Sequence, residues 1–182
     1  MGSVIRWARW PLGLLSALCA LTISLGAAAA APSSSHEHLE HSGDIERALR
    51  SRQFEVQGAT STVTNENIYA NTLAATIASL KSQGYDVTDL ANGLTAFQGR
   101  LAASQAELGD AQAGLAVHEG FDAQGQVVDK GFARKTVDQI HADVLQIKQN
   151  ASTVKNELHD LLTRYDRING VNLDPNAVED AF

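Results

Sequence analysis

The chain has 182 residues, of which 44% are hydrophobic and only 5% aromatic, and its 21 acidic residues outnumber 14 basic ones to give a formal net charge of −7. An acidic protein repels phosphate backbones, so this balance argues against a nucleic-acid-binding protein. The single cysteine, Cys19, lies close to the N-terminus, so the rest of the chain must hold its fold without disulfides.

Residues 1–30 have the layout of a secretory signal peptide. Arg6 and Arg9 precede an apolar run over residues 12–25, and small residues follow with a cleavage site near Ala30. We therefore expect a secreted or periplasmic protein that has no membrane contact after cleavage. Removal of the two arginines leaves 12 basic residues against 21 acidic ones, a formal charge of −9. The uncharged stretch 10–31 approaches the ~20 residues that span a bilayer, so an uncleaved membrane anchor is the alternative.

A flexible, histidine-rich arm is expected over residues 31–43, where the polar sequence shows no apolar period. His36, His38 and His41 lie within six residues of one another, and imidazole is a common ligand of zinc, copper and nickel. These histidines are the candidate metal ligands. The arrangement is not the helical HExxH motif, because Glu40 stands where that motif needs its second histidine. The alternative is a solvated leader without any cofactor.

Three seams of apolar residues at spacings of three and four predict long helices over about 44–82, 87–119 and 130–168. Short connections require neighbouring helices to run antiparallel. The expected fold is all-α: an elongated, coiled-coil-like, up-down-up three-helix bundle over residues 44–170. Each seam is recognisable from a few of its members: Ile45, Leu49, Val56, Leu73 and Leu80; Leu90, Phe97, Leu101 and Leu108; Val137, Ile140, Ile147, Val154, Leu161 and Ile168.

Turn and cap residues mark the ends of these helices. Gly84, Gly120 and Gly170 are placed to take the left-handed conformation that closes a helix, and Asp86 and Asp129 are placed to cap the helices that follow. Residues 58–64 combine a glycine with clustered β-branched residues, which lower helix propensity. The first helix either continues through this segment, or kinks or breaks there.

Polar residues interrupt the seams at Arg52, Glu66, Ser104 and His118. When the first two helices fold back on each other at the tight turn between them, Glu66 meets Ser104 and Arg52 meets His118. We expect a buried polar layer of these four residues, because a buried charge is costly unless it is paired. The alternative is that Arg52 and Glu66 reach solvent past small neighbours.

Phe54, Ile68 and Tyr69 form a candidate interaction face. Phe54 and Ile68 lie two heptads apart on the outer side of the first helix, and Tyr69 is beside Ile68. Single exposed apolar residues are common, but a line of them indicates an interface with a second copy or with a protein partner that the sequence does not identify. The remaining segment, residues 171–182, is acidic, and we expect it to be disordered.

No catalytic constellation is visible in the sequence. There is no G-x-S-x-G motif, no thiol after signal cleavage, no glycine-rich turn between a strand and a helix, and no pair of acids on the core side of two seams. An enzyme should show at least one such set, so we expect a protein that is not an enzyme.

The segment HEGFDAQGQVVD, followed by ARKTVDQIHADV, is similar to a helix–HxGFDAxGxVxD–helix pattern in uncharacterised exported bacterial proteins, and the resemblance covers about residues 77–168. The chain departs from this pattern at Lys130, where a proline is expected. The resemblance implies a secreted α-helical protein without an established activity. We expect a structural or interaction module of the cell envelope or exterior; the alternative is a periplasmic metal-binding or chaperone-like protein that uses the histidine arm.

Overall fold

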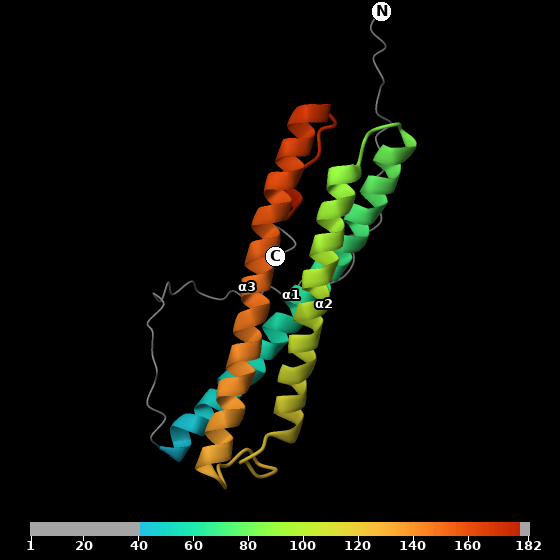
Figure 1. Cartoon of the computed structure of the whole chain (residues 1–182). Coiled ribbons are helices and arrows are strands. Elements are labelled where there is room, and N and C mark those ends of the chain that lie inside the picture. Colours follow the sequence, from blue (N-terminus) through green and yellow to red (C-terminus); the bar gives the residue numbers. More distant parts are fainter. Residues whose placement is uncertain (1–40, 179–182) are drawn as a thin grey trace, which may run out of the picture. The chain divides into compact units, whose positions relative to one another are not determined.

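The computed structural model describes residues 41–178, except for the side chains of residues 176 and 177. These residues form three α-helices, α1 (Ser42–Ser82), α2 (Thr88–Val117) and α3 (Lys130–Asn169), followed by the short 3-10 helix η1 (Pro175–Val178). Figure 1 shows that α2 runs back along α1 and that α3 reverses direction again, and each helix packs against the other two. The predicted all-α three-helix bundle is confirmed. The expected signal peptide lies outside the described residues.

The core is formed by the apolar seams of the three helices. Leu90, Ile140 and Ile147 are among its almost completely buried residues. The third seam differs from the prediction near its end, where Leu162 replaces Leu161 as the buried residue and Ile168 is 72% exposed. Within residues 41–178, no helix is long and apolar enough to cross a membrane.

Helix α1 is continuous through residues 58–64. The hydroxyl groups of Thr60, Thr62 and Thr64 donate to the backbone carbonyls four residues earlier, at distances of 2.8, 3.2 and 2.8 Å. These bonds keep the hydroxyl groups within the helix, where they do not draw the backbone into another conformation. The threonine-rich segment is therefore compatible with a helix, and the alternative of a break is wrong.

Helix ends follow the predicted cap residues in most cases. Gly84 and Gly170 both take the left-handed conformation, with φ of 88° and 61°. The Asp86 carboxylate accepts the backbone N–H of Thr88, the first residue of α2, at 3.0 Å, but the N-cap residue of α2 is Val87 and not the predicted Asp86. The Asp129 carboxylate accepts two N–H groups from the first turn of α3 at 2.8 and 3.0 Å, which satisfies donors that have no partner within the helix.

Helix α2 ends earlier than predicted. It stops at Val117, and His118 takes the left-handed conformation with φ of 35° while its backbone N–H donates to Gly114 O at 2.9 Å. The expectation that residue 119 is helical and that Gly120 closes α2 is wrong. The reason lies in the following loop, where the Gly120 carbonyl accepts the N–H groups of Val128 and Asp129 at 2.9 and 3.1 Å.

The loop between α2 and α3 is packed tightly against the first turn of α3. Gly120 has φ of 89°, and a Cβ atom at this position would lie 2.1 Å from the backbone nitrogen of Ala133. Within the loop, the Asp122 carboxylate accepts the N–H groups of Gln124 and Gln126 at 2.9 and 2.8 Å. The GFDAQGQVVD segment is therefore a defined connector whose aspartates and first glycine have structural roles.

Residues 171–178 fold back onto the bundle, in contrast to the expected disordered tail. Val171 and Val178 are buried, and the N–H of Leu173 donates to the Asp166 carboxylate at 3.2 Å. Figure 1 shows this segment returning beside α3, and η1 packs on that helix. Apolar residues spaced along an acidic segment are enough to anchor it when a groove is available. Residues 179–182 of the predicted tail lie outside the described residues.

Candidate functional site

A buried polar layer crosses the middle of the bundle. Glu66 of α1 and Ser104 of α2 are each 1% exposed, as expected from the interruptions in their seams. The Ser104 hydroxyl accepts a hydrogen bond from the Asn150 side-chain amide of α3 at 3.3 Å. Neither carboxylate oxygen of Glu66 has a hydrogen-bond partner. The Ser104 hydroxyl therefore has a hydrogen-bond partner, whereas the buried Glu66 carboxyl group has none.

Burial raises the pKa of the Glu66 carboxyl from 4.5 to about 7. The physical cause is desolvation, which penalises the ionised form and is not offset here by any cation or hydrogen-bond donor. The carboxyl group is therefore close to half protonated near neutral pH. This is an unusual state for a glutamate.

Arg52 and His118 do not join this layer, so the prediction of a four-residue layer is wrong for these two members. Arg52 instead pairs with Glu55, one turn ahead on its own helix. His118 is the residue that ends α2. It is half-buried, and its Nδ1 atom lies 3.1 Å from the carbonyl oxygen of Ala116. A local partner for the arginine and the early end of α2 thus remove the expected contact between the helices.

Glu55 is the centre of a small charged cluster on the α1–α3 side. Burial by itself would raise the pKa of its carboxyl, but the hydrogen bond and charge of Arg52, together with the charges of Lys148 and His141, outweigh burial and hold this pKa below its ordinary value. His141 Nδ1 lies 3.6 Å from the carboxylate. The cluster resembles a structural ion-pair network that links two helices.

Two of the three residues assigned to the candidate interaction face on α1 are exposed, and the interaction itself stays a prediction. The side chains of Phe54 and Ile68 are 74% and 60% exposed. Tyr69, in contrast, is half-buried and packs on the core, with its ring centroid 6.3 Å from that of Phe97. Tyr69 was assigned to the face because it neighbours Ile68 in sequence, but consecutive helical residues point about 100° apart. It belongs to the edge of the α1–α2 core.

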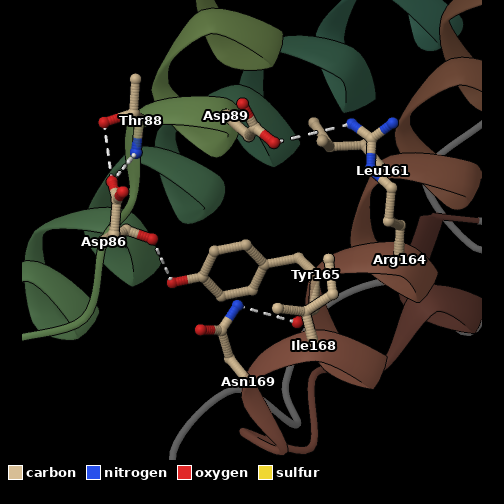
Figure 2. Close-up of a pocket in the computed structure, with 8 residues that line it drawn as sticks. All are labelled: Asp86, Thr88, Asp89, Leu161, Arg164, Tyr165, Ile168 and Asn169. Atoms are coloured by element: carbon tan, nitrogen blue, oxygen red, sulfur yellow. Dashed lines mark hydrogen bonds and ion pairs between the residues drawn. The ribbon is translucent and has the colours of Figure 1, made fainter.

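The pocket in Figure 2 lies where the start of α2 meets the end of α3 and has a volume of about 200 Å³. The Tyr165 hydroxyl donates to the Asp86 carbonyl at 2.9 Å, and Arg164 lies 3.9 Å from the Asp89 carboxylate across the opening. Burial and the nearby Asp86 raise the pKa of the Tyr165 hydroxyl. These polar groups bond to each other, so the pocket is a junction between helices and not an arrangement for chemistry.

A second hollow, of about 290 Å³, lies between the end of α2 and the start of α3. Gly114, Val117 and Ile140 give it an apolar lining, with Glu119 and Lys135 among the residues around it. Asp110, Thr136 and Gln139 add further polar groups to its lining.

The proposed metal ligands can be placed only in part. His41 precedes α1, is exposed, and has Nδ1 3.7 Å from the Asp44 carboxylate. His36 and His38 lie outside the described residues. Within residues 41–178, no group of three or more histidine, cysteine, aspartate or glutamate side chains could hold a metal ion.

The sequence contains a further signal that the heptad analysis missed. Between Val56 and Leu80 the only charged residue is Glu66, and the structure buries it. The outer side of α1 is therefore free of charge for most of its length. This feature could have been found by reading the exposed positions of the helix with the same attention as its core positions.

Comparisons with known proteins add no relative to this description. No protein-family model matches the chain, and neither the curated proteins nor the solved structures include a match. The resemblance to exported proteins with the HxGFDAxGxVxD pattern accordingly stays a prediction.

Proposed function

We propose that this chain is an exported, non-catalytic helical-bundle protein that acts by surface contact, as a structural or interaction module of the cell envelope or exterior. The observation that carries the proposal is the outer side of α1, where Ile68 is exposed within a stretch, Val56 to Leu80, whose single charged residue is the buried Glu66, and Phe54 is exposed just before that stretch. Large apolar residues on such a surface favour contact with another macromolecule. Export rests on the leader-like composition of residues 1–30.

The proposal can be tested by placing a photo-crosslinking amino acid at Phe54 or Ile68 in the producing cells. Irradiation should give adducts of defined mass from both positions. The same amino acid at Ile168, which is 72% exposed at the far end of α3, serves as the matched control. Adducts at Ile168 alone, or at none of the three positions, would contradict a contact surface on α1.

A metal-binding or chaperone-like role for the histidine arm is the second candidate. It is supported by three imidazoles within six residues and by the exposure of His41. Zinc, copper or nickel should be titrated into the chain and into a variant with His36, His38 and His41 replaced by alanine. Weak binding that is lost in the variant is expected if the arm orders itself around the ion, and identical isotherms would remove this candidate.

A further inference from the structure

We infer that the Glu66 layer, defined as Glu66, Ser104 and Asn150, is a pH-sensitive switch: ionisation of Glu66 opens the middle of α1 to water while both ends of this helix stay packed. While Glu66 is protonated, the three helices stay closed at this layer. The switch lies in the interior of the bundle, so it is independent of the proposed surface contact. Its effect is a local opening of one helix, which is distinct from a loss of stability of the whole bundle.

The Glu66 carboxyl group has no partner that would stabilise a negative charge in the closed bundle. Its side chain is 1% exposed, and neither of its oxygens has a hydrogen-bond partner. The Asn150 side-chain amide, the donor that α3 contributes to the layer, is directed to the Ser104 hydroxyl at 3.3 Å. An ionised carboxylate at this position lacks the hydrogen bonds that it has in water, so it can regain them only if water enters the layer.

Charged groups on α1 and on the C-terminal segment do not compensate for the burial of Glu66. On α1 there is no other charged residue between Val56 and Leu80. Tyr69 lies one turn after Glu66, but burial, together with the charge of Asp174, raises the pKa of its hydroxyl to about 12. Tyr69 is therefore neutral wherever Glu66 titrates.

Charged groups on α2 do not compensate either. The charged residues of α2 nearest to Ser104 in sequence are Arg100 and Glu107. Arg100 is directed to α3, where it pairs with Glu157 at 2.7 Å. Glu107 has the same sign of charge as an ionised Glu66, so it cannot stabilise that charge.

On α3, the charged residues nearest to Asn150 in sequence are Lys148 and Lys155. Lys148 is exposed, and its charge lowers the pKa of Glu55. Desolvation by burial is the cause of the raised pKa of Glu66, with no contribution from a lysine or an arginine. The closed layer therefore favours the protonated carboxyl group from all the sides on which helices pack against it.

Both ends of α1 are tied to the rest of the bundle. Near the start of the helix, the Glu46 carboxylate accepts the N–H of Val127 from the loop before α3 at 3.2 Å, and Glu55 lies 3.6 Å from His141 of α3. Just beyond the end of the helix, the Asp86 carbonyl accepts a hydroxyl group of α3 at 2.9 Å. These contacts hold α1 in place on either side of the Glu66 layer.

The middle of α1 is packed through smaller side chains than its ends. The buried residues on either side of Glu66 are Ala59, Val63 and Ala70, whereas leucine and isoleucine are buried towards both ends of the helix. Small side chains remove less apolar area from water, so they contribute less free energy to packing. Parting the helices at the Glu66 layer therefore costs less than parting them at either end, and the opening should be confined to the middle of α1.

The test is amide hydrogen exchange of the full chain, measured by mass spectrometry at pH 5 and pH 7.5 and corrected for the intrinsic rate of exchange at each pH. The pKa of Glu66 falls from about 7 to 4.5 when the layer opens, so the opening equilibrium should rise by about fiftyfold between these pH values. We expect residues 59–73 to lose protection by this factor and, at pH 7.5, to exchange faster than residues 45–56 of the same helix. A local opening exposes little surface, so this exchange should be almost independent of low urea concentrations.

Two variants show whether Glu66 is the cause. Glu66→Gln should abolish the loss of protection, because glutamine does not ionise, and Glu119→Gln, at an exposed position, should retain it. A loss of protection that persists in Glu66→Gln would overturn the inference.

The wild type alone decides whether the opening is local, so the test holds even if Glu66→Gln does not fold. If residues 59–73 and 45–56 lose protection together and with the same dependence on urea, the bundle opens as a whole and the inference is wrong. An effect of Glu66 on overall stability would remain in that case.

Discussion

Replacing Glu66 by glutamine should change how the stability of the bundle depends on pH. The folded state holds the pKa of this carboxyl at about 7, against 4.5 for the ordinary group. A carboxyl whose pKa is raised on folding binds its proton more tightly in the folded state, so the protein is more stable at low pH. That extra stability is lost as the pH rises from about 4.5 through 7.

The size of the effect follows from the pKa difference. At about 1.4 kcal/mol per pKa unit, ionising Glu66 in the core costs about 3 kcal/mol once the pH exceeds the folded pKa. Glutamine fills the same space and does not ionise. The stability of Glu66→Gln relative to the wild type should therefore increase by about 3 kcal/mol between pH 4 and pH 7.5.

The assay is urea unfolding followed by circular dichroism at several pH values, with Glu119→Gln as the control because Glu119 lies on the surface. The control should not reproduce the change, since its carboxylate stays in water in both states. Parallel stability curves for the wild type and Glu66→Gln across this range would show that Glu66 has a partner or reaches water, and the reasoning about the polar layer would be refuted.

Three further changes test the connections between the elements. Gly120→Ala should cost at least about 2 kcal/mol of unfolding free energy, because the new Cβ meets the α3 backbone. Gly125→Ala, which also has positive φ but open space around it, should cost only about 1 kcal/mol; equal losses in urea unfolding would contradict the steric argument. Tyr165→Phe removes the hydrogen bond that the Tyr165 hydroxyl donates to the Asp86 carbonyl, and it should lower the unfolding free energy by about 1 kcal/mol. An unchanged thermal midpoint would show that this bond contributes nothing. Truncation after Gly170 removes the two buried valines of the C-terminal segment, Val171 and Val178, and should lower the unfolding free energy by about 3 kcal/mol or more. If this segment were disordered, its removal would leave the unfolding free energy unchanged.

The helices and most of their ends could be predicted because they depend on local chemistry. An apolar seam repeats along one side of a helix whatever packs on it, so the residues that α1 and α2 bury were visible in the spacing alone. Gly84 and Asp129 act through bonds to residues a few positions away, which makes their capping roles readable from sequence.

The candidate sites were predicted less well because they depend on which element covers a residue. The burial of Glu66 followed from its seam position, but the lack of any partner for it could not be known before the neighbouring side chains were placed. Arg52 had a partner on its own helix and another expected across the bundle, and sequence gave no means to choose between them.

By itself, the sequence determined that this protein is a bundle of three antiparallel helices with an uncharged outer side on α1, since period and charge are properties of the chain. Only the tertiary structure decided that residues 171–178 are anchored, that Tyr69 faces the core, and that α2 ends at Val117. The burial of Tyr69 and of the terminal valines depends on packing between elements, and the end of α2 depends on the bonds of the loop that follows it. Neither is visible in the period or the charge of the chain.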